Sequence, residues 1–365
     1  MVTQAVVGCT LRVTLPVPRG CTVQPLRTLA TALIVVLAGA IVASPQAIAT
    51  TTPDTTCSET SLPVSLGLLP ETVHGQLCLP AGDTPRTVQL LVHGGTYNSQ
   101  YWDLPYDSGS YSYQRDMAAN GLATFAVDLL GSGRSSQPLS ALVTGTSQAS
   151  VVHQIVGKLC AGAVSGLRFD RVVLVGHSMG SGVAVLEAAT YHDVDGVILT
   201  GMSHSMNLLA LTNIFVQGVR PALLDPELSQ RGGDPGYVTT MPGTRGLFHD
   251  PGVVDPGVLA ADEATKDQVP ATVVPDLLTL AFVSPLSRAI TVPVLIANGD
   301  RDGLFCAFTC SSEESFLAAE NPYFSPDAHL EVRLVPQAGH AVALAISAPD
   351  YRADVRDWLS MHFAG

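Results

Sequence analysis

The sequence contains few basic residues, and lysine is almost absent from it. Lys158 and Lys266 are its two lysines, and 18 basic residues stand against 31 acidic ones, which gives a formal net charge of −13 at pH 7. Proteins that bind nucleic acid or an anionic membrane surface through charge need clustered lysine and arginine side chains. The basic residues here are scattered along the chain. We therefore predict no nucleic acid or anionic membrane as a partner.

Long apolar runs are missing as well, because no stretch reaches the ~20 residues that a membrane-spanning helix needs. A shorter run, residues 29–42, follows a leader with three arginines and no acidic residue or lysine, and it precedes Ala47-Ile48-Ala49. This order is typical of a secretory signal peptide, and the lack of an Arg-Arg pair favours the general export route. We predict that residues 1–49 are a cleaved signal and that residues 50–365 are secreted without a stable membrane anchor. An uncleaved N-terminal anchor is the alternative.

Cysteine is scarce, and five of the seven cysteines follow residue 49. An oxidising compartment favours disulfides. We expect Cys57 to pair with Cys78 and Cys306 to pair with Cys310, which leaves Cys160 as a free thiol; buried free thiols throughout are the alternative. No histidine lies at ligand spacing from these cysteines, so the sequence predicts no zinc site built from them.

Short apolar strands alternate with amphipathic helices through most of the chain. This alternation predicts an α/β fold with a mostly parallel central sheet that helices cover on both faces. Strands are expected at 64–66, 73–79, 87–92, 123–128, 171–177, 194–200, 290–298 and 329–335, and helices at 113–120, 146–163, 180–189 and 348–361.

Residues 205–288 interrupt the alternation, and their middle part is rich in proline, glycine and aspartate. An insertion after a strand lies at the sheet edge where open α/β sheets bind ligands. We therefore predict a cap over the site, with a purely structural excursion as the alternative. Candidates for an apolar pocket lining, each equally explained by core packing, are Tyr97, Tyr101, Trp102, Met206, Leu208, Leu209 and Phe215.

The most informative motif is Gly176-His177-Ser178-Met179-Gly180, which directly follows the strand expected at 171–177. A serine at a strand-to-helix turn sits on strained backbone with its hydroxyl exposed, and the glycines avoid collisions with neighbouring elements. The N-terminus of the following helix favours negative charge beside the serine. The motif predicts that Ser178 is a nucleophile.

A serine hydroxyl needs a base within hydrogen-bond reach and a third group that orients the base. His340 is the best-placed base, because it closes a glycine-containing loop after the last expected strand. Asp302 is the preferred acid, because it lies a few residues into the loop after the preceding strand and could bend back over the sheet edge. His204 and Asp300 are the alternatives for the base and the acid.

Acyl transfer also needs donors for the negative charge that develops on the acyl oxygen. His93-Gly94-Gly95-Thr96 directly follows the strand at 87–92, and its glycines allow close backbone approach. We predict the backbone N–H groups of Gly95 and Met179 as these donors, with that of Thr96 as an alternative.

These features together resemble the α/β-hydrolase superfamily of the capped kind, over residues 62–363. The resemblance rests on the chain order Ser178, Asp302, His340, the elbow, the His-Gly-Gly turn and the segment Asp128-Leu-Leu-Gly-Ser-Gly-Arg-Ser135. It implies an α/β-hydrolase fold and a serine hydrolase. Together with the predicted signal, we expect a secreted enzyme that cleaves a small-molecule ester or lactone through an acyl-enzyme. No metal or organic cofactor is implied.

The resemblance leaves other activities open. Epoxide hydrolases and dehalogenases of this superfamily carry an aspartate where this chain has Ser178. Aminopeptidase relatives usually carry proline where this chain has Thr96, which puts peptide cleavage in doubt. An aminopeptidase or amidase, an acyltransferase or a perhydrolase with the same three residues is the alternative, and a non-catalytic binding protein with this fold is a remote one.

Overall fold

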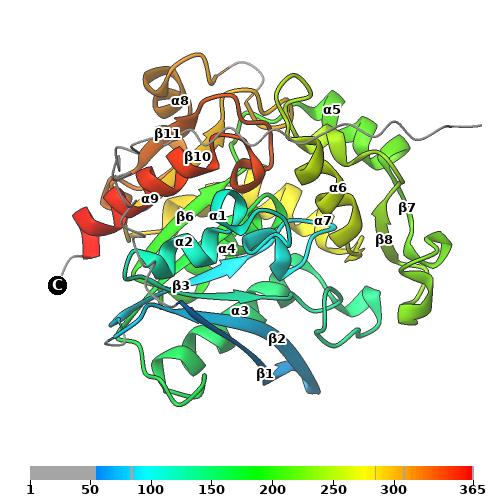
Figure 1. Cartoon of the computed structure of the whole chain (residues 1–365), viewed down its shortest axis with the longest axis horizontal. Helices are drawn as coiled ribbons and strands as arrows, with labels where there is room; N and C mark the ends of the chain where they lie inside the picture. The colour runs from blue at the N-terminus through cyan, green and yellow to red at the C-terminus, as the bar shows by residue number, and fades with distance from the viewer. Residues whose placement is uncertain (1–54, 83–84, 284, 307–308, 364–365) are drawn as a thin grey trace, which may run out of the picture. The chain divides into compact units, whose positions relative to one another are not determined.

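An eight-stranded, mostly parallel sheet forms the centre of the chain in the computed structural model, which describes residues 55–82, 85–283, 285–306 and 309–363 (Figure 1). The strand order is β1-β2-β4-β3-β5-β6-β10-β11. β2 pairs antiparallel with β1 and with β4, and the other neighbours are parallel. The strands are β1 (Thr56–Leu66), β2 (Leu69–Leu79), β3 (Thr87–Val92), β4 (Ala123–Val127), β5 (Arg171–His177), β6 (Gly196–Thr200), β10 (Val294–Gly299) and β11 (Glu331–Val335).

Helices cover both faces of this sheet because its central strands are apolar on both sides. In β5, Val172 and Leu174 pack into one hydrophobic core with residues of α3 and α4, whereas Val173 and Val175 pack into a second core with residues of α2 and α9. Continuous apolar strands of this kind are expected of a parallel sheet. The helices are α1 (Ser108–Tyr111), α2 (Tyr113–Ala119), α3 (Gly145–Cys160), α4 (Met179–Tyr191), α8 (Glu313–Glu320) and α9 (Ala348–Phe363).

The predicted fold class is confirmed, and the largest difference concerns the first two strands. The sequence predicted short strands at 64–66 and 73–79, but β1 and β2 form a hairpin of two 11-residue strands. The first half of β1 is polar and mostly exposed, so no apolar pattern marks it in the sequence. The hairpin turns at Gly67, whose φ of 61° favours glycine.

The insertion between β6 and β10 has a small sheet of its own. In this segment, which spans residues 201–293, three short antiparallel strands lie in the order β7-β8-β9. Its elements are α5 (Leu208–Asn213), a π-helical turn (Ile214–Gly218), β7 (Val219–Pro221), β8 (Tyr237–Thr240), a 3₁₀ turn (Arg245–Phe248), α6 (Pro256–Thr265), β9 (Val269–Pro270), α7 (Val273–Asp276) and a second π-helical turn (Leu277–Val283).

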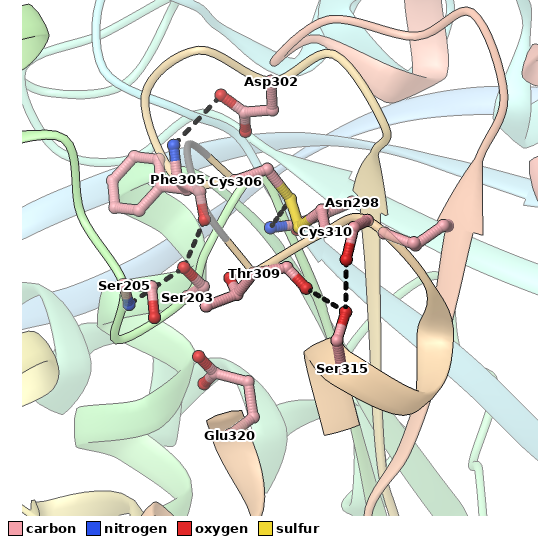
Figure 2. Close-up of a disulfide and its surroundings, with 12 residues drawn as sticks. Ser203, Ser205, Asn298, Asp302, Phe305, Cys306, Thr309, Cys310, Ser315 and Glu320 are labelled. Atoms are coloured by element: carbon pink, nitrogen blue, oxygen red, sulfur yellow. Dashed lines mark hydrogen bonds between the residues drawn. A yellow bond between two sulfur atoms is a disulfide. The ribbon is translucent and has the colours of Figure 1, made fainter. Parts of the chain in front are cut away.

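The cysteines of the described residues pair as the sequence predicts. Cys57 and Cys78 are directly opposite each other in the β1–β2 hairpin and form a disulfide, and Cys306 forms a second one with Cys310 (Figure 2). Cys160 is a half-buried free thiol at the end of α3. The predicted signal peptide lies outside the described residues. No helix within those residues is both long and apolar enough to cross a membrane.

Candidate active site

Ser178 occupies the sharp turn between β5 and α4. Its φ of 53° and ψ of −116° are unusual for a residue with a side chain. The two flanking glycines are required by close contacts. A Cβ on Gly176 would lie 2.5 Å from the carbonyl oxygen of Gly180, and one on Gly180 would lie 2.3 Å from the carbonyl oxygen of Val92 on the neighbouring strand. The backbone therefore has the form of a nucleophile elbow.

His340 and Asp302 meet in the buried region beside this elbow. The Nδ1 atom of His340 lies 2.9 Å from Oδ2 of Asp302, and the two residues are only 3% and 1% exposed. The second carboxylate oxygen, Oδ1, accepts hydrogen bonds from the backbone N–H groups of Leu304 at 2.8 Å and Phe305 at 3.2 Å. Figure 2 shows the second of these bonds. These contacts direct Oδ2 toward the imidazole.

Asp300 and His204, the alternatives for the acid and the base, lie elsewhere in the structure. Asp300 is exposed, and its carboxylate lies 4.0 Å from the guanidinium of the adjacent Arg301. The buried side chain of His204 instead pairs with Glu320, at 2.6 Å between Nδ1 and Oε2, and stacks on Tyr323 at 3.9 Å between ring centroids. His204 therefore belongs to a buried polar cluster outside the cavity that Ser178 lines.

The His-Gly-Gly-Thr turn after β3 packs directly on the elbow. A Cβ on Gly94 would lie 3.2 Å from Cβ of Ser178, and one on Gly95 would lie 3.7 Å from Sδ of Met179. Thr96 adopts a left-handed backbone, with φ of 61°. His93 anchors the start of the turn, because its Nε2 accepts a hydrogen bond from the backbone N–H of Leu129 at 3.0 Å. Burial lowers the pKa of this imidazole, which keeps it neutral as an acceptor.

A fully buried arginine from the insertion, Arg245, holds the far side of this turn. It donates from Nη1 to the Thr96 hydroxyl at 2.8 Å, and from Nε and Nη2 to Oδ1 of Asp262 at 3.0 and 2.6 Å. Its guanidinium carbon lies 3.9 Å from the centroid of the Tyr97 ring. Burial alone would raise the pKa of Asp262, but Arg245 and a 2.7 Å contact with His249 lower it. Sequence reasoning missed this cluster.

One apolar cavity of about 420 Å³ joins these parts. Ser178 and His340 both line it, together with Gly95, Thr96 and Met179. The insertion supplies most of the remaining wall, including Leu211, Ile214, Phe215, Val219, Val238, Thr240, Phe248, Val269, Leu277 and Leu278. The parallel strands β3, β5, β10 and β11 each end beside the site, which is where open α/β sheets bind ligands.

Most of the apolar residues that the sequence offered for the pocket lie elsewhere. Phe215 lines the cavity. The core-packing alternative describes four of the others: Tyr97, Tyr101 and Trp102 are buried in the second core, and Met206 packs against the first. Leu208 and Leu209 are exposed.

Comparison with known proteins agrees with the observed fold. The sequence profile of the Alpha/beta hydrolase family matches residues 89–355, more than half of the chain. The chain belongs to this family. Membership in this family supports hydrolase activity. Epoxide hydrolase 3 of Xenopus tropicalis is 30% identical over 114 residues, which are 31% of this chain and 27% of that protein. The match thus spans about a quarter of the relative's length.

Solved structures share the fold of this α/β hydrolase at low sequence identity. An esterase from Thermogutta terrifontis superimposes with a TM-score of 0.55 and 19% identity, over 84% of this chain and 99% of its own. A monoglyceride lipase from Saccharomyces cerevisiae gives 0.57 and 16%, over 87% and 98%. An N-acyl homoserine lactonase gives 0.53 and 13%, over 84% and 98%.

Proposed function

We propose that this chain is a serine hydrolase that cleaves a carboxylic ester or lactone with an apolar acyl group. The observation that carries the proposal is that Ser178, at the elbow, and His340, paired with Asp302, line the same apolar cavity. A nucleophile, a base and an orienting carboxylate are the groups that acyl transfer through a serine requires.

In the proposed reaction, the Ser178 hydroxyl attacks the substrate carbonyl carbon while Nε2 of His340 takes the proton. The oxyanion that forms accepts hydrogen bonds from the backbone N–H groups of Gly95 and Met179. His340 then protonates the leaving alcohol, and water attacks the acyl-enzyme with the same imidazole as base. Asp302 accepts a hydrogen bond from the Nδ1–H group of His340 throughout, which fixes the tautomer and stabilises the imidazolium.

The cavity favours an ester over a peptide substrate. None of the described residues that line it is acidic, so nothing there would pair with the free amino group of an aminopeptidase substrate. Ser178 in place of aspartate favours acyl transfer over epoxide opening. The names of the structural neighbours include an esterase, a lipase and a lactonase, which fits the same choice.

Export through the predicted signal at residues 1–49 is part of the proposal. Two disulfides in the described residues support it, because disulfides persist in oxidising compartments and are rare in the cytosol. Sequencing the N-terminus of protein recovered from the culture medium tests this part. The expected first residue is Thr50.

Labelling with a fluorophosphonate tests the nucleophile. The wild-type chain is expected to react, and Ser178→Ala is expected to lose both labelling and ester hydrolysis. Asp302→Asn should lower kcat by about 10⁴, as the same change does in the well-studied Ser-His-Asp triad. The matched control is Asp300→Asn, two residues away and exposed, which should leave kcat unchanged. Labelling that persists in Ser178→Ala would refute the proposal.

A series of aryl esters with lengthening acyl chains tests the substrate class. Each methylene buried in the cavity contributes about 0.8 kcal/mol, so kcat/KM should rise about fourfold per methylene until the cavity is filled. The measurement is the initial rate of each ester below its KM. Rates that are flat or fall from the acetyl ester upward would contradict an apolar acyl site.

A further inference from the structure

Three side chains that could ligate a metal ion lie close together at α3, α4 and the loop after α4. They are His153 on α3, Glu187 on α4 and Asp193 in the loop that follows α4. One ligand atom from each lies within 4.8 Å of the other two. Nδ1 of His153 is 2.6 Å from Oδ2 of Asp193, and these two side chains are 41% and 28% exposed. The cluster is thus open to solvent on one side.

The buried member of the cluster lacks the partners that a buried carboxylate needs. Glu187 is fully buried, and neither of its carboxylate oxygens has a hydrogen-bond partner. Oδ1 of Asp193 is also buried without a partner. No lysine or arginine among the described residues forms a salt bridge with Glu187. Unpartnered carboxylate oxygens cost free energy on burial, so this site requires a cation or a proton.

We propose that His153, Glu187 and Asp193 bind a divalent cation of the zinc type. One imidazole nitrogen and two carboxylate oxygens are ligands that Zn²⁺ accepts, and the exposed side leaves room for water as a fourth ligand. Ligand atoms around tetrahedral zinc are roughly 3.4 Å apart. The three ligand atoms lie within 4.8 Å of one another, so changes in their separations of up to about 1.4 Å would complete the site. Calcium prefers six to eight oxygen ligands and fits less well.

The surroundings of the cluster suit a structural ion. Tyr191 stacks on the His153 ring at 4.0 Å between centroids and 9° between planes, which fixes the ring orientation. Glu187 follows Ser178 by nine residues on α4, which places it roughly 14 Å along the helix from the elbow. An ion here would tie α3 to α4 without touching the reacting atoms.

The alternative occupant is a proton shared between Glu187 and Asp193. Burial and the negative charge of Asp193 raise the pKa of Glu187 to about 9. The raised pKa favours a bound proton on Glu187 while no cation is present, because no lysine or arginine in the described part of the chain pairs with this carboxylate. Metal binding and proton sharing therefore make different predictions, and both can be measured.

Zinc titration of the purified chain, first stripped with EDTA and carrying Cys160→Ser to remove the free thiol, tests the proposal. Calorimetry should show one Zn²⁺ per chain, and zinc at a hundred times its Kd should raise Tm by about 4 °C. Calcium at the same concentration should not. His153→Gln and Glu187→Gln should each weaken binding at least a hundredfold. Because His153 is partly exposed, its variant is expected to fold even where the buried one does not.

The matched control is His192→Asn, which removes an exposed histidine next to Asp193. Residue 192 has a φ of 52°, a conformation that asparagine tolerates. This variant should bind zinc as the parent does. The proposal is overturned if the parent chain binds no zinc, if binding survives His153→Gln, or if it is lost in His192→Asn. Absent zinc binding together with unchanged or higher stability in Glu187→Gln would identify the shared proton as the occupant.

Discussion

At the scale of single residues, Asp128 links segments that are far apart in the sequence. Its carboxylate accepts hydrogen bonds from the backbone N–H groups of Ser99 and Arg134, each at 2.8 Å, and lies 3.4 Å from Nδ1 of His74. Gly133 is required beside it, because a Cβ there would lie 2.0 Å from the carboxylate carbon. The segment from Asp128 onward, which in the sequence contributed only to a family resemblance, thus holds the loop that follows the turn at residues 93–96. This turn carries the proposed oxyanion donor Gly95, and we call it the oxyanion turn.

The first prediction concerns the pH dependence that Asp128 confers. Burial alone would raise its pKa, but the nearby His74 and the hydrogen bonds from the backbone N–H groups of Arg134 and Ser99 lower it to about 2. A lowered pKa stabilises the fold above the unfolded-state pKa of 3.8, and that stability is lost as the pH falls through about 2. Asp128→Asn should therefore cost about 2 kcal/mol in free energy of unfolding at pH 7, and the difference from wild type should vanish between about pH 4 and pH 2.

Urea denaturation at a series of pH values measures this effect. Asp300→Asn is the control, because that carboxylate is exposed. A difference between wild type and Asp128→Asn that stays constant down to pH 2 would show that packing, and not ionisation, accounts for the cost.

The sequence predicted candidate residues better where they follow strands than where they lie in irregular segments. Ser178, Asp302 and His340 each come soon after an apolar strand, and the parallel sheet brings the ends of those strands together. Their catalytic roles stay predictions. Arg245 and Asp262 lie in a segment without apolar periodicity, so nothing local indicates that they meet. Their contact depends on how the whole insertion folds.

At the scale of elements, the 3₁₀ turn Arg245–Phe248 contacts two separate parts of the site. Arg245 donates to Thr96 in the oxyanion turn, and the carbonyl oxygen of Phe248 accepts a hydrogen bond from the backbone N–H of Ala341, next to His340, at 2.8 Å. The backbone also approaches closely, because a Cβ on Gly339 would lie 2.5 Å from the carbonyl carbon of His249. The insertion therefore contacts the segments on either side of the site in addition to lining the cavity.

The second prediction is that Arg245 acts by positioning the oxyanion turn. Arg245→Lys keeps the charge near Asp262 but removes the planar group that reaches both Asp262 and the Thr96 hydroxyl. We expect kcat to fall about tenfold with little change in KM, because the proposed role of the turn is to stabilise the oxyanion and not the bound ester. Steady-state kinetics on an aryl ester gives both parameters.

Arg220→Lys is the matched control, since Arg220 pairs with Asp225 within the insertion and not with the oxyanion turn. It should change neither parameter. A rise in KM with unchanged kcat in Arg245→Lys would assign this arginine to substrate binding and refute a positioning role.

Elements were predictable where burial dictates the pattern. The strands β3, β4 and β5 are buried along nearly their whole length, and their predicted bounds agree with the structure to within a residue. The start of β1 is polar and lies at the sheet edge, where pairing is with one neighbour and leaves no apolar signature. The strands β7, β8 and β9 are two to four residues long, too short for a period to be recognised.

At the scale of the whole molecule, the two disulfides lie at opposite ends of the sheet order. Cys57–Cys78 joins β1 and β2 at one edge, whereas Cys306–Cys310 follows β10, which is next to the other edge. The second lies in the loop of Asp302, whose carboxylate is already held by two backbone N–H groups. The two bonds therefore differ in their distance from the site and in the length of chain that they close.

The third prediction separates stability from activity through the first of these bonds. Cys57→Ala with Cys78→Ala opens a loop with a sequence separation of 21 residues, and the free energy of unfolding should fall by about 3 kcal/mol because the unfolded chain gains that conformational freedom. The kcat for an aryl ester should stay within about twofold, because the proposed catalytic residues follow β5, β10 and β11, away from the hairpin. Guanidinium denaturation and steady-state kinetics on the same preparation measure both.

Dithiothreitol should destabilise the wild type by more than the variant, since the variant keeps only Cys306–Cys310. A variant as stable as the wild type would mean that the hairpin is equally constrained in the unfolded state, and a large loss of kcat would mean that the edge hairpin reaches the site through the core.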